Sequence, residues 1–183
     1  MKTLILLAHP NIEQSLANKT IIDHITSSST ESVTIRNISK LYPNYKIDAK
    51  AEQEVLLQYD TIVFQYPFYW YSMPAILKHW FDIVLEYQFA YGSEGDKLKG
   101  KNFQLSITGG GPQDSYYALG YNHFRIPEFL KGLEQTAYLA QMNYLEPIYT
   151  HSMVYIEGVY NVKEEVVARA VQHAERLLEV IKA

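Results

Sequence analysis

The chain has 183 residues, 48% of them hydrophobic, with 16 basic and 20 acidic residues and a net charge of −4. This length suits one domain spanning residues 1–183, and the even spread of charge excludes a nucleic-acid-binding tract and a polybasic membrane anchor. Cysteine is absent, which excludes disulfides, thiolate metal ligands and a cysteine nucleophile, and we expect no metal site. The first apolar run ends at His9, too early for a signal sequence or a membrane span. A cytoplasmic protein is therefore expected.

Apolar runs alternate with helical patterns in the first half of the chain. Short continuous apolar runs predict buried strands, and apolar residues spaced by three and four predict helices. Ser15 stands just before such a pattern and is a candidate N-cap. The predicted elements are a strand at Leu4–Ala8, a helix from Leu16 that ends at Ser27–Thr30, a more exposed strand at Ser32–Arg36, a loop at Leu41–Lys50, a short helix at Ala51–Leu57 with Glu52 and Glu54 on its outside, and a strand at Thr61–Gln65.

The second half continues the same alternation. A strong apolar stripe predicts a helix at Ala75–Leu85, in which Trp80 is expected in the core. The remaining elements are an aperiodic excursion at Tyr87–Lys101, a strand at Asn102–Thr108, a loop at Gly109–Tyr117, a helix near Pro127–Tyr138, a fifth strand within Leu145–Tyr155 that is broken or extended, and an amphipathic helix at Glu164–Lys182.

Strands that alternate with helices predict an α/β fold in which a parallel sheet is covered by helices on both faces. Five strands fit a flavodoxin-like three-layer sandwich with strand order 2-1-3-4-5. In that order a ligand crevice lies beyond the carboxyl ends of strands one and three. The loops after strands one, three and four are therefore expected to converge on one site.

The loop after the third predicted strand holds four aromatic residues between two prolines, from Pro67 to Pro74. Rings on a stiff connection form a natural wall for a flat ligand, although the same stretch could be a dimer contact or a core segment. Convergence of three loops favours the ligand. The 16 tyrosines of the chain fit aromatic ligands and a subunit interface equally well.

The other two loops offer donors for a ligand. The first ends at a helix amino terminus, where free N–H groups attract an anion and where Ser15, Asn18 and His9 stand nearby, although Ser15 could be only a helix cap. Three consecutive glycines, Gly109–Gly111, allow a ligand to approach the backbone closely, although a glycine-rich turn is the ordinary explanation. No Gly-x-Gly-x-x-Gly motif or Walker lysine follows the first strand. A phosphate end, an aromatic wall and a glycine floor together describe a flavin mononucleotide site.

These residues belong to motifs that resemble those of the flavodoxin-like NAD(P)H:quinone oxidoreductases. Within that family the sequence is most similar to the branch of ancillary flavoproteins of glutathione-gated potassium efflux systems. The resemblance extends from Leu4 to about Tyr149. It rests on Ala8-His9-Pro10 with Ser15-Leu16-Ala17-Asn18, Leu41-Tyr42-Pro43 with Ile47-Asp48 and Ala51-Glu52-Gln53, Pro67-Phe68-Tyr69-Trp70-Tyr71 with Pro74, Phe89-Ala90-Tyr91-Gly92, and Thr108-Gly109-Gly110-Gly111.

The resemblance implies a two-electron flavoenzyme that uses FMN, with FAD as an alternative. NADH or NADPH would pass hydride to the flavin and leave before a quinone or another small acceptor takes its place, in a ping-pong cycle. The implied contacts to the phosphate and ribityl chain are His9, Ser15, Leu16, Ala17 and Asn18. Those to the ring are Pro67, Phe68, Tyr69 and Trp70, with Thr108, Gly109, Gly110 and Gly111 along its pyrimidine edge.

Two candidate catalytic residues, Tyr116 and Asn122, follow from the same resemblance. Tyr116 matches a tyrosine that works with a histidine six residues later in the mammalian-type quinone reductases, and here that later position is Asn122. An asparagine can donate a hydrogen bond but carries no proton at neutral pH, so a Tyr-His relay is not assumed. His123 is adjacent in the sequence.

Assembly and a second function are further expectations. A homodimer is expected because a group of aromatic residues exceeds what one flavin can cover, namely Tyr66, Tyr71, Tyr87, Phe89 and Tyr91. The alternative function is that of a regulatory subunit that docks on a membrane potassium efflux protein, at the inner face of the membrane, with secondary redox activity.

Overall fold

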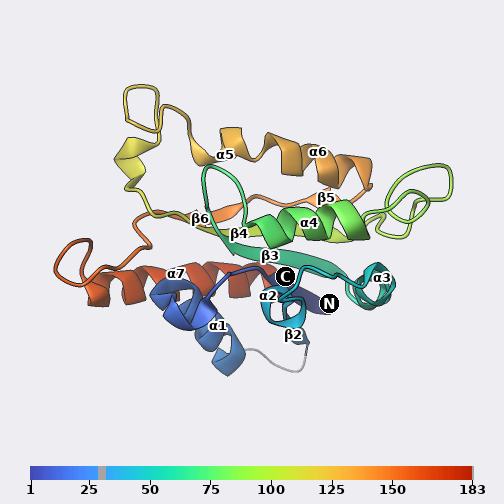
Figure 1. The fold of residues 1–183 in the computed structure, drawn as a ribbon, viewed down its shortest axis with the longest axis horizontal. Coiled ribbons are helices and arrows are strands. Elements are labelled where there is room, and N and C mark those ends of the chain that lie inside the picture. The colour runs from blue at the N-terminus through green and yellow to red at the C-terminus, as the bar shows by residue number, and fades with distance from the viewer. Residues whose placement is uncertain (29–31, 183) are drawn as a thin grey trace.

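The computed structural model describes residues 1–28 and 32–182 and has three layers, with a sheet between two layers of helices (Figure 1). The strands are β1 (Thr3–Leu7), β2 (Val33–Asn37), β3 (Thr61–Pro67), β4 (Asn102–Thr108), β5 (Asn143–Tyr144) and β6 (Ile148–Thr150). The helices are α1 (Leu16–Ser28), α2 (Ile38–Leu41), α3 (Ala49–Leu57), α4 (Ala75–Val84), α5 (Ile126–Phe129), α6 (Lys131–Leu139) and α7 (Lys163–Lys182), with short 3-10 turns η1 (Ile12–Gln14) and η2 (Gln113–Ser115). Of the predicted end of the first helix, Ser29 and Thr30 lie outside the described residues.

The sheet has the order β2-β1-β3-β4, and its outer edge is completed by β5 and β6, both paired with β4. All of these pairs are parallel. The predicted α/β class and the flavodoxin-like order 2-1-3-4-5 are confirmed. The register aligns Leu7 with Gln65 and Pro67 with Thr108, so β1, β3 and β4 end at the same edge of the sheet.

The fifth strand is interrupted. β5 pairs with the start of β4 and β6 pairs with its end, and the chain leaves the sheet after Thr150. Pro147 lies in the gap and has no N–H group to donate to a neighbouring strand. The side chain of Gln104 donates to the carbonyl oxygen of Glu146 at 3.0 Å and so satisfies the backbone at the interruption.

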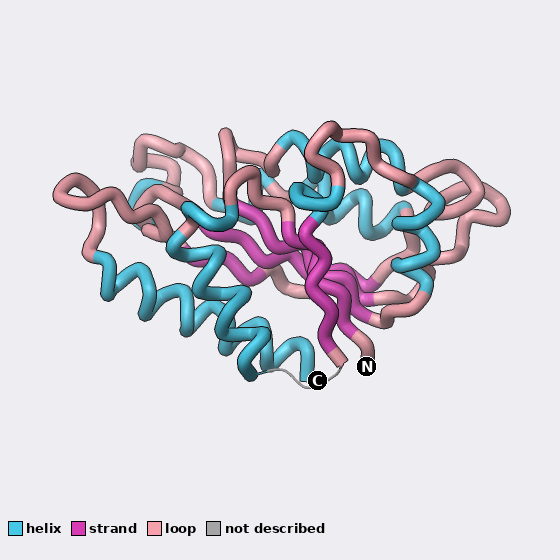
Figure 2. The backbone as a smooth tube through the Cα atoms, turned by 60° about the horizontal axis from the view of Figure 1, so that its bottom comes forward, coloured by secondary structure: helices cyan, strands magenta, loops and turns pink. Residues whose placement is uncertain are grey.

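Two cores lie on opposite faces of the sheet, because successive strand residues point to opposite faces. On one face, Leu4 and Phe64 pack with α4 and α6, whereas on the other Ile5 and Val63 pack with α1 and α7. The views in Figures 1 and 2 agree that helices cover both faces. Among the described helices, none is long and apolar enough to cross a bilayer.

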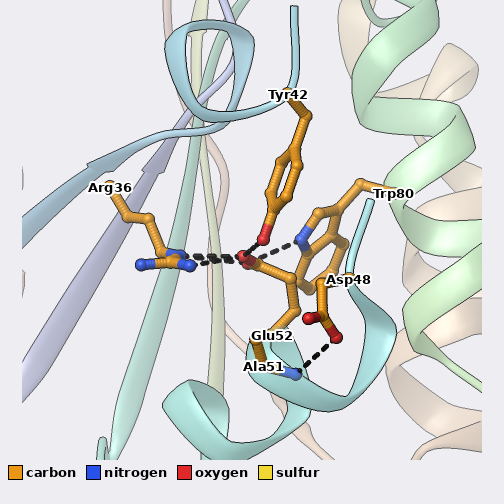
Figure 3. Close-up of polar contacts among 6 residues, drawn as sticks. All are labelled: Arg36, Tyr42, Asp48, Ala51, Glu52 and Trp80. Carbon is orange, nitrogen blue, oxygen red and sulfur yellow. Dashed lines mark hydrogen bonds and ion pairs between the residues drawn. The ribbon is translucent and has the colours of Figure 1, made fainter. Parts of the chain in front are cut away.

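A buried carboxylate joins three elements on the α4 face. Glu52 was expected on the outside of its helix, but only 1% of its side chain is exposed. Its oxygens accept hydrogen bonds from Arg36 of β2 at 2.6 Å, from the Tyr42 hydroxyl, and from Nε1 of Trp80 at 2.9 Å (Figure 3). Trp80 is in the core, as predicted. Arg36 is not left as an unpaired charge, because its guanidinium is bound to the Glu52 carboxylate.

The predicted loop at Leu41–Lys50 is shorter than expected at both ends. α2 includes Leu41, and its first turn is capped by Asn37, whose Oδ1 accepts from the Lys40 N–H at 3.0 Å. α3 begins at Ala49, where Asp48 accepts from the Ala51 N–H at 3.1 Å (Figure 3). Asn and Asp are favoured at such positions because their side chains satisfy a free helical N–H.

We predict that Glu52→Ala lowers the free energy of unfolding by about 3–5 kcal/mol, because it leaves the Arg36 guanidinium without its carboxylate. Urea unfolding followed by circular dichroism measures this loss. The matched control is Glu54→Ala in the same helix, which removes an exposed carboxylate and should change stability by less than about 0.5 kcal/mol. Equal losses in the two variants would contradict the role assigned to Glu52.

Candidate functional site

The loops after β1, β3 and β4 lie together at one edge of the sheet, as predicted. The Ala8 N–H donates to the Gln65 carbonyl at 3.0 Å, and the Phe68 N–H donates to the Thr108 carbonyl at 2.9 Å. A direct side-chain bond also links α1 to the end of β4, from Nδ2 of Asn18 to Oγ1 of Thr108 at 3.0 Å. Groups from three separate parts of the sequence therefore face one site.

Ser15 caps α1, as predicted. Its Oγ accepts from the Asn18 N–H at 3.2 Å and from Asn18 Nδ2 at 3.0 Å. With both oxygen lone pairs used, the hydroxyl hydrogen is left to donate outward. The N–H groups of Leu16 and Ala17 in the first turn have no intrahelical partner. Three donors thus surround the amino terminus of α1, which suits an anion.

His9 is a neutral donor beside this helix end. Its Nδ1 accepts from the Asn11 N–H at 3.1 Å, so the ring hydrogen is on Nε2. Burial lowers the pKa of His9, which keeps the ring uncharged at neutral pH. Its ring lies 6.2 Å from that of Tyr69, which links the first loop to the aromatic loop.

The aromatic loop forms one wall of a cavity of about 240 Å³. Phe68 is buried and packs edge-on to Phe129 at 5.7 Å, whereas Tyr71 stacks on Phe129 at 5.1 Å. Trp70 is 91% exposed, and both Trp70 and Tyr71 have positive φ angles, of 48° and 61°. The lining residues of this cavity, which we call the ring pocket, are Phe68, Trp70, Tyr71, Gly110, Gly111, Tyr116, Tyr121 and Asn122.

The predicted ring contacts divide into two groups. Phe68, Trp70, Gly110 and Gly111 line the ring pocket. Pro67 ends β3, Tyr69 faces His9, and Thr108 is bound to Asn18, and none of these three lines the pocket. Gly109 is also outside it, and its N–H donates to the Thr150 carbonyl at 2.8 Å.

Gly110 and Gly111 are required for space rather than for an unusual backbone conformation. None of Gly109, Gly110 and Gly111 has a positive φ. A Cβ on Gly111 would lie 3.2 Å from Ser115 Oγ and 3.2 Å from the Tyr116 ring, which is tight. Gly111 therefore allows η2 and Tyr116 to pack against the loop. Within the described chain the N–H groups of Gly110 and Gly111 have no hydrogen-bond partner, so both are free to meet a ligand.

Tyr116 and Asn122 both line the ring pocket, but only Asn122 has its polar side-chain atoms hydrogen-bonded within the protein. The Tyr116 hydroxyl bonds to no described residue, its ring lies 4.9 Å from His151, and burial raises its pKa. Asn122 is engaged on both sides, donating to Ser115 Oγ at 2.7 Å and accepting from the Tyr71 hydroxyl at 3.1 Å. Asn122 thus ties the aromatic loop to η2. His123 is exposed and adopts a positive φ of 60°.

Two residues expected in an exposed aromatic patch are buried instead. Tyr66 is 1% exposed and Phe89 is 9% exposed, because both pack into the core beneath α4. Tyr71, Tyr87 and Tyr91 are exposed, as expected.

A chain of buried polar side chains runs from this site to α7. Gln65 Nε2 donates to Asn18 Oδ1 at 2.8 Å, and Gln65 Oε1 accepts from the Ser106 hydroxyl. Ser106 Oγ lies 2.7 Å from Nε2 of His173, whose Nδ1 lies 2.8 Å from Thr150 Oγ1. Thr150 Oγ1 in turn accepts from the Arg176 guanidinium at 2.6 Å.

The direction of each hydrogen bond in this chain follows from the Ser106 hydroxyl. Its one hydrogen goes to Gln65 Oε1, so its oxygen accepts from His173, and Nδ1 of the neutral ring is left to accept from Thr150. His173 then carries its hydrogen on Nε2 and donates to Ser106, which donates to Gln65. The result is the Asn18 orientation described above, with its NH₂ group toward Ser15. Burial and the nearby Arg176 lower the pKa of His173 to about 3, so the ring stays neutral.

Comparison with protein families gives a match to the family described as having a flavodoxin-like fold, over residues 1–178. The chain belongs to this family.

The chain is also similar to several known proteins. The chain is 39% identical over 147 residues to the glutathione-regulated potassium-efflux system ancillary protein KefG of Pectobacterium atrosepticum, covering 80% of this chain and 79% of KefG. General stress protein 14 of Treponema denticola, solved in complex with FMN, is 35% identical with a TM-score of 0.88, covering 100% of this chain and 98% of that one. An NADPH-quinone reductase from P. pentosaceus is 29% identical with a TM-score of 0.78, covering 95% and 98%.

Sequence reasoning on this flavodoxin-like chain did not single out His173, Ser106 or His151. A signal for the buried chain is nonetheless visible in the strands. Gln65 is a polar residue in an apolar strand, and Ser106 and Thr108 alternate with apolar residues in the next strand. Such polar residues, when buried, need partners from a neighbouring element.

We predict that lowering the pH destabilises the wild-type protein more steeply than His173→Gln. Below the ordinary histidine pKa of 6.5 the unfolded chain gains a proton at this position, whereas the folded chain does not until about pH 3. The free energy of unfolding therefore falls with pH across this window, by up to about 1.4 kcal/mol per pH unit from this one group. Glutamine keeps a donor and an acceptor but does not titrate.

Denaturant unfolding at intervals from pH 7 to about pH 4.5 measures the difference, which should reach roughly 2–3 kcal/mol at the lower end. Parallel stability-versus-pH curves for the two proteins would show that His173 titrates normally in the folded state.

Proposed function

We propose that this chain is an FMN-dependent NAD(P)H:quinone oxidoreductase that works by a ping-pong cycle. The observation that carries the proposal is the position of an anion-binding helix end and an aromatic pocket at the same edge of the sheet, in a chain similar to a protein solved with FMN. Similarity to an NADPH-quinone reductase supports the reaction class. FAD remains the alternative cofactor, and the donor is NADH or NADPH.

The residues at the helix end fit the phosphate and ribityl chain. The Ser15 hydroxyl and the Leu16 and Ala17 N–H groups would donate to phosphate oxygens, and His9 would donate through Nε2. Asn18 contributes by holding Ser15 as a donor, since its own amide is occupied by Ser15, Gln65 and Thr108. A phosphate dianion would therefore meet several donors and no carboxylate among these groups.

The ring pocket fits a flat ring system. Phe68 and Trp70 would contact the ring, with Pro67 and Tyr69 supporting the loop on which they stand. Gly110 and Gly111 would donate N–H groups to the pyrimidine edge, where they would stabilise negative charge. Thr108 and Gly109 act by fixing that loop, because both are already bound to protein groups.

When bound, the flavin would accept hydride from the nicotinamide and pass it to the quinone. Tyr116 would donate its free hydroxyl to the ring or to the quinone, and Asn122 would hold Tyr71 and η2 in place around it. The aromatic residues of the pocket would keep water away from the transferred hydride.

We also propose a homodimer. Tyr71, Tyr87 and Tyr91 are exposed, and Tyr91 borders an apolar groove of about 390 Å³ between α4 and α6. A second copy would cover apolar surface that is unusual on a monomer. Light scattering that gives a monomer mass at micromolar concentration would refute this assembly.

We predict that the purified protein binds FMN and shows flavin absorbance. A titration of FMN into flavin-free protein, followed by fluorescence quenching, measures the affinity. Identifying the flavin that heating releases from the purified protein distinguishes FMN from FAD. A protein that takes up neither flavin would overturn the proposed function.

We predict that Tyr116→Phe keeps FMN binding but slows flavin reduction or reoxidation by about tenfold. The variant loses one hydrogen bond to the flavin ring or the quinone, on which negative charge develops during the reaction. Stopped-flow absorbance with NADPH and then with a quinone separates the two half-reactions. Tyr45→Phe, a remote tyrosine on the surface, is the matched control. If both rates were unchanged in Tyr116→Phe, the hydroxyl would have no role in turnover.

A second candidate function rests on the similarity to KefG. In that case the chain would act in the cytoplasm as a regulatory subunit, held at the inner face of the membrane by a potassium efflux protein. Co-purification with such a transporter would support this function. Potassium efflux that is unchanged after deletion of the protein would contradict it.

A further inference from the structure

A second, larger cavity of about 1210 Å³ adjoins the ring pocket. It lies between the loop after β4, the strand β6 and α7. Tyr116 lines both cavities and is the wall between them. On one side its ring lies 6.3 Å from Phe68, and on the other 4.9 Å from His151. A ligand that extends past Tyr116 would therefore occupy both.

Three arginines line this second cavity, which we call the arginine cavity: Arg125, Arg169 and Arg176. Arg169 and Arg176 lie two turns apart on α7, so they share one face of the helix. Arg176 donates to Thr150 Oγ1 at 2.6 Å and to the Tyr149 carbonyl at 3.2 Å, and Arg169 donates to the Ser152 carbonyl at 3.0 Å. These bonds hold both guanidinium groups at the cavity wall.

The positive charge in this cavity is only partly compensated. Arg169 pairs with Glu165 at 3.4 Å. In the described part of the chain, Arg125 and Arg176 form no ion pair, and the two carboxylates that also line the cavity, Asp114 and Glu146, pair with neither. Guanidinium groups bind phosphate oxygens through paired N–H donors, so the cavity suits a phosphate-bearing ligand better than a neutral one.

We propose that the arginine cavity binds the adenosine diphosphate half of the nicotinamide dinucleotide, an inference that rests on the proposed function. The nicotinamide would lie against the flavin ring at the ring pocket, and the pyrophosphate would pass Tyr116 and meet Arg169 and Arg176. Tyr117, which is 44% exposed, lines the same cavity and offers a ring on which the adenine can stack.

This arrangement separates the two substrates of the ping-pong cycle. A quinone carries no phosphate and needs only to reach the flavin ring at the ring pocket, so it gains nothing from the arginines. The donor's affinity depends on them. A change in the arginine cavity should therefore alter the KM for NADPH and leave the KM for the quinone as it is.

The test uses the FMN-loaded protein and the double variant Arg169→Gln/Arg176→Gln. Glutamine keeps an N–H donor for Thr150 and for the Ser152 carbonyl, so the wall of the cavity is preserved. Calorimetric titration with ADP measures the site without turnover, and we expect ADP to bind the wild type and to bind the variant about tenfold or more weakly. The KM for NADPH should rise by about the same factor, with the quinone KM unchanged.

The matched control is Lys163→Gln/Lys182→Gln, which removes the same amount of charge from exposed positions of the same helix, outside the cavity. It should keep the wild-type ADP affinity and NADPH KM. A control that weakens ADP as much as the arginine variant would show a general charge effect and overturn the site.

Two other results would also overturn it: no binding of ADP to the FMN-loaded wild type, and a parallel rise of the NADPH and quinone KM values in the arginine variant. Each result can occur in a protein that binds FMN and reduces quinones, so each would contradict ADP binding in the arginine cavity without contradicting the proposed function. Failure to take up flavin would instead contradict the proposed function.

Discussion

The carboxamide of Asn18 is the group on which the site depends. It is buried and must satisfy an oxygen and two N–H groups inside the protein, and it does so with Gln65, Ser15 and Thr108. Because its oxygen and nitrogen cannot exchange roles, only one orientation leaves the Ser15 hydroxyl directed outward. One side chain thus joins the helix end to β3 and β4, and by donating to the Ser15 oxygen it leaves the Ser15 hydroxyl as a donor.

That orientation is determined far from Asn18. Gln65 is bound through Ser106 and His173 to Thr150, and the single hydroxyl hydrogen of Ser106 sets the direction of these bonds. The last helix of the fold is therefore part of the site, although none of the residues in its buried face would touch the phosphate.

The buried carboxylate of Glu52 holds the opposite side of the sheet. It connects β2 and α3 to Trp80 of α4, and α4 begins directly after the aromatic loop. A buried ion pair adds little net stability compared with apolar packing, but removing one partner is costly. The Glu52 ion pair matters here because it fixes the position of α4, the helix that follows the aromatic loop.

Alternation of apolar runs and helical patterns was enough to predict the strand order, and the rule for parallel sheets was enough to predict that three loops converge. Ser15 as a cap and Trp80 in the core also followed from local pattern. Glu52 did not, because its partners Arg36 and Trp80 are 16 and 28 residues away in the sequence. Tyr66 and Phe89 were placed at the surface by composition, whereas packing beneath α4 buries them. The direction of the His173 chain depends on contacts of α7 with β4 and β6 and of β4 with β3, which no local pattern contains.

The interruption of the fifth strand also affects how molecules meet one another. An open sheet presents unpaired N–H and C=O groups at its outermost strand, and a long straight edge there can pair with the same edge of another molecule. In this chain that edge consists of a two-residue and a three-residue segment, separated by a proline, and the nearest carbonyl in the gap is already bound to Gln104. Such an edge is too short and too irregular to extend the sheet from one molecule into the next, so self-association through β-pairing on this side is disfavoured.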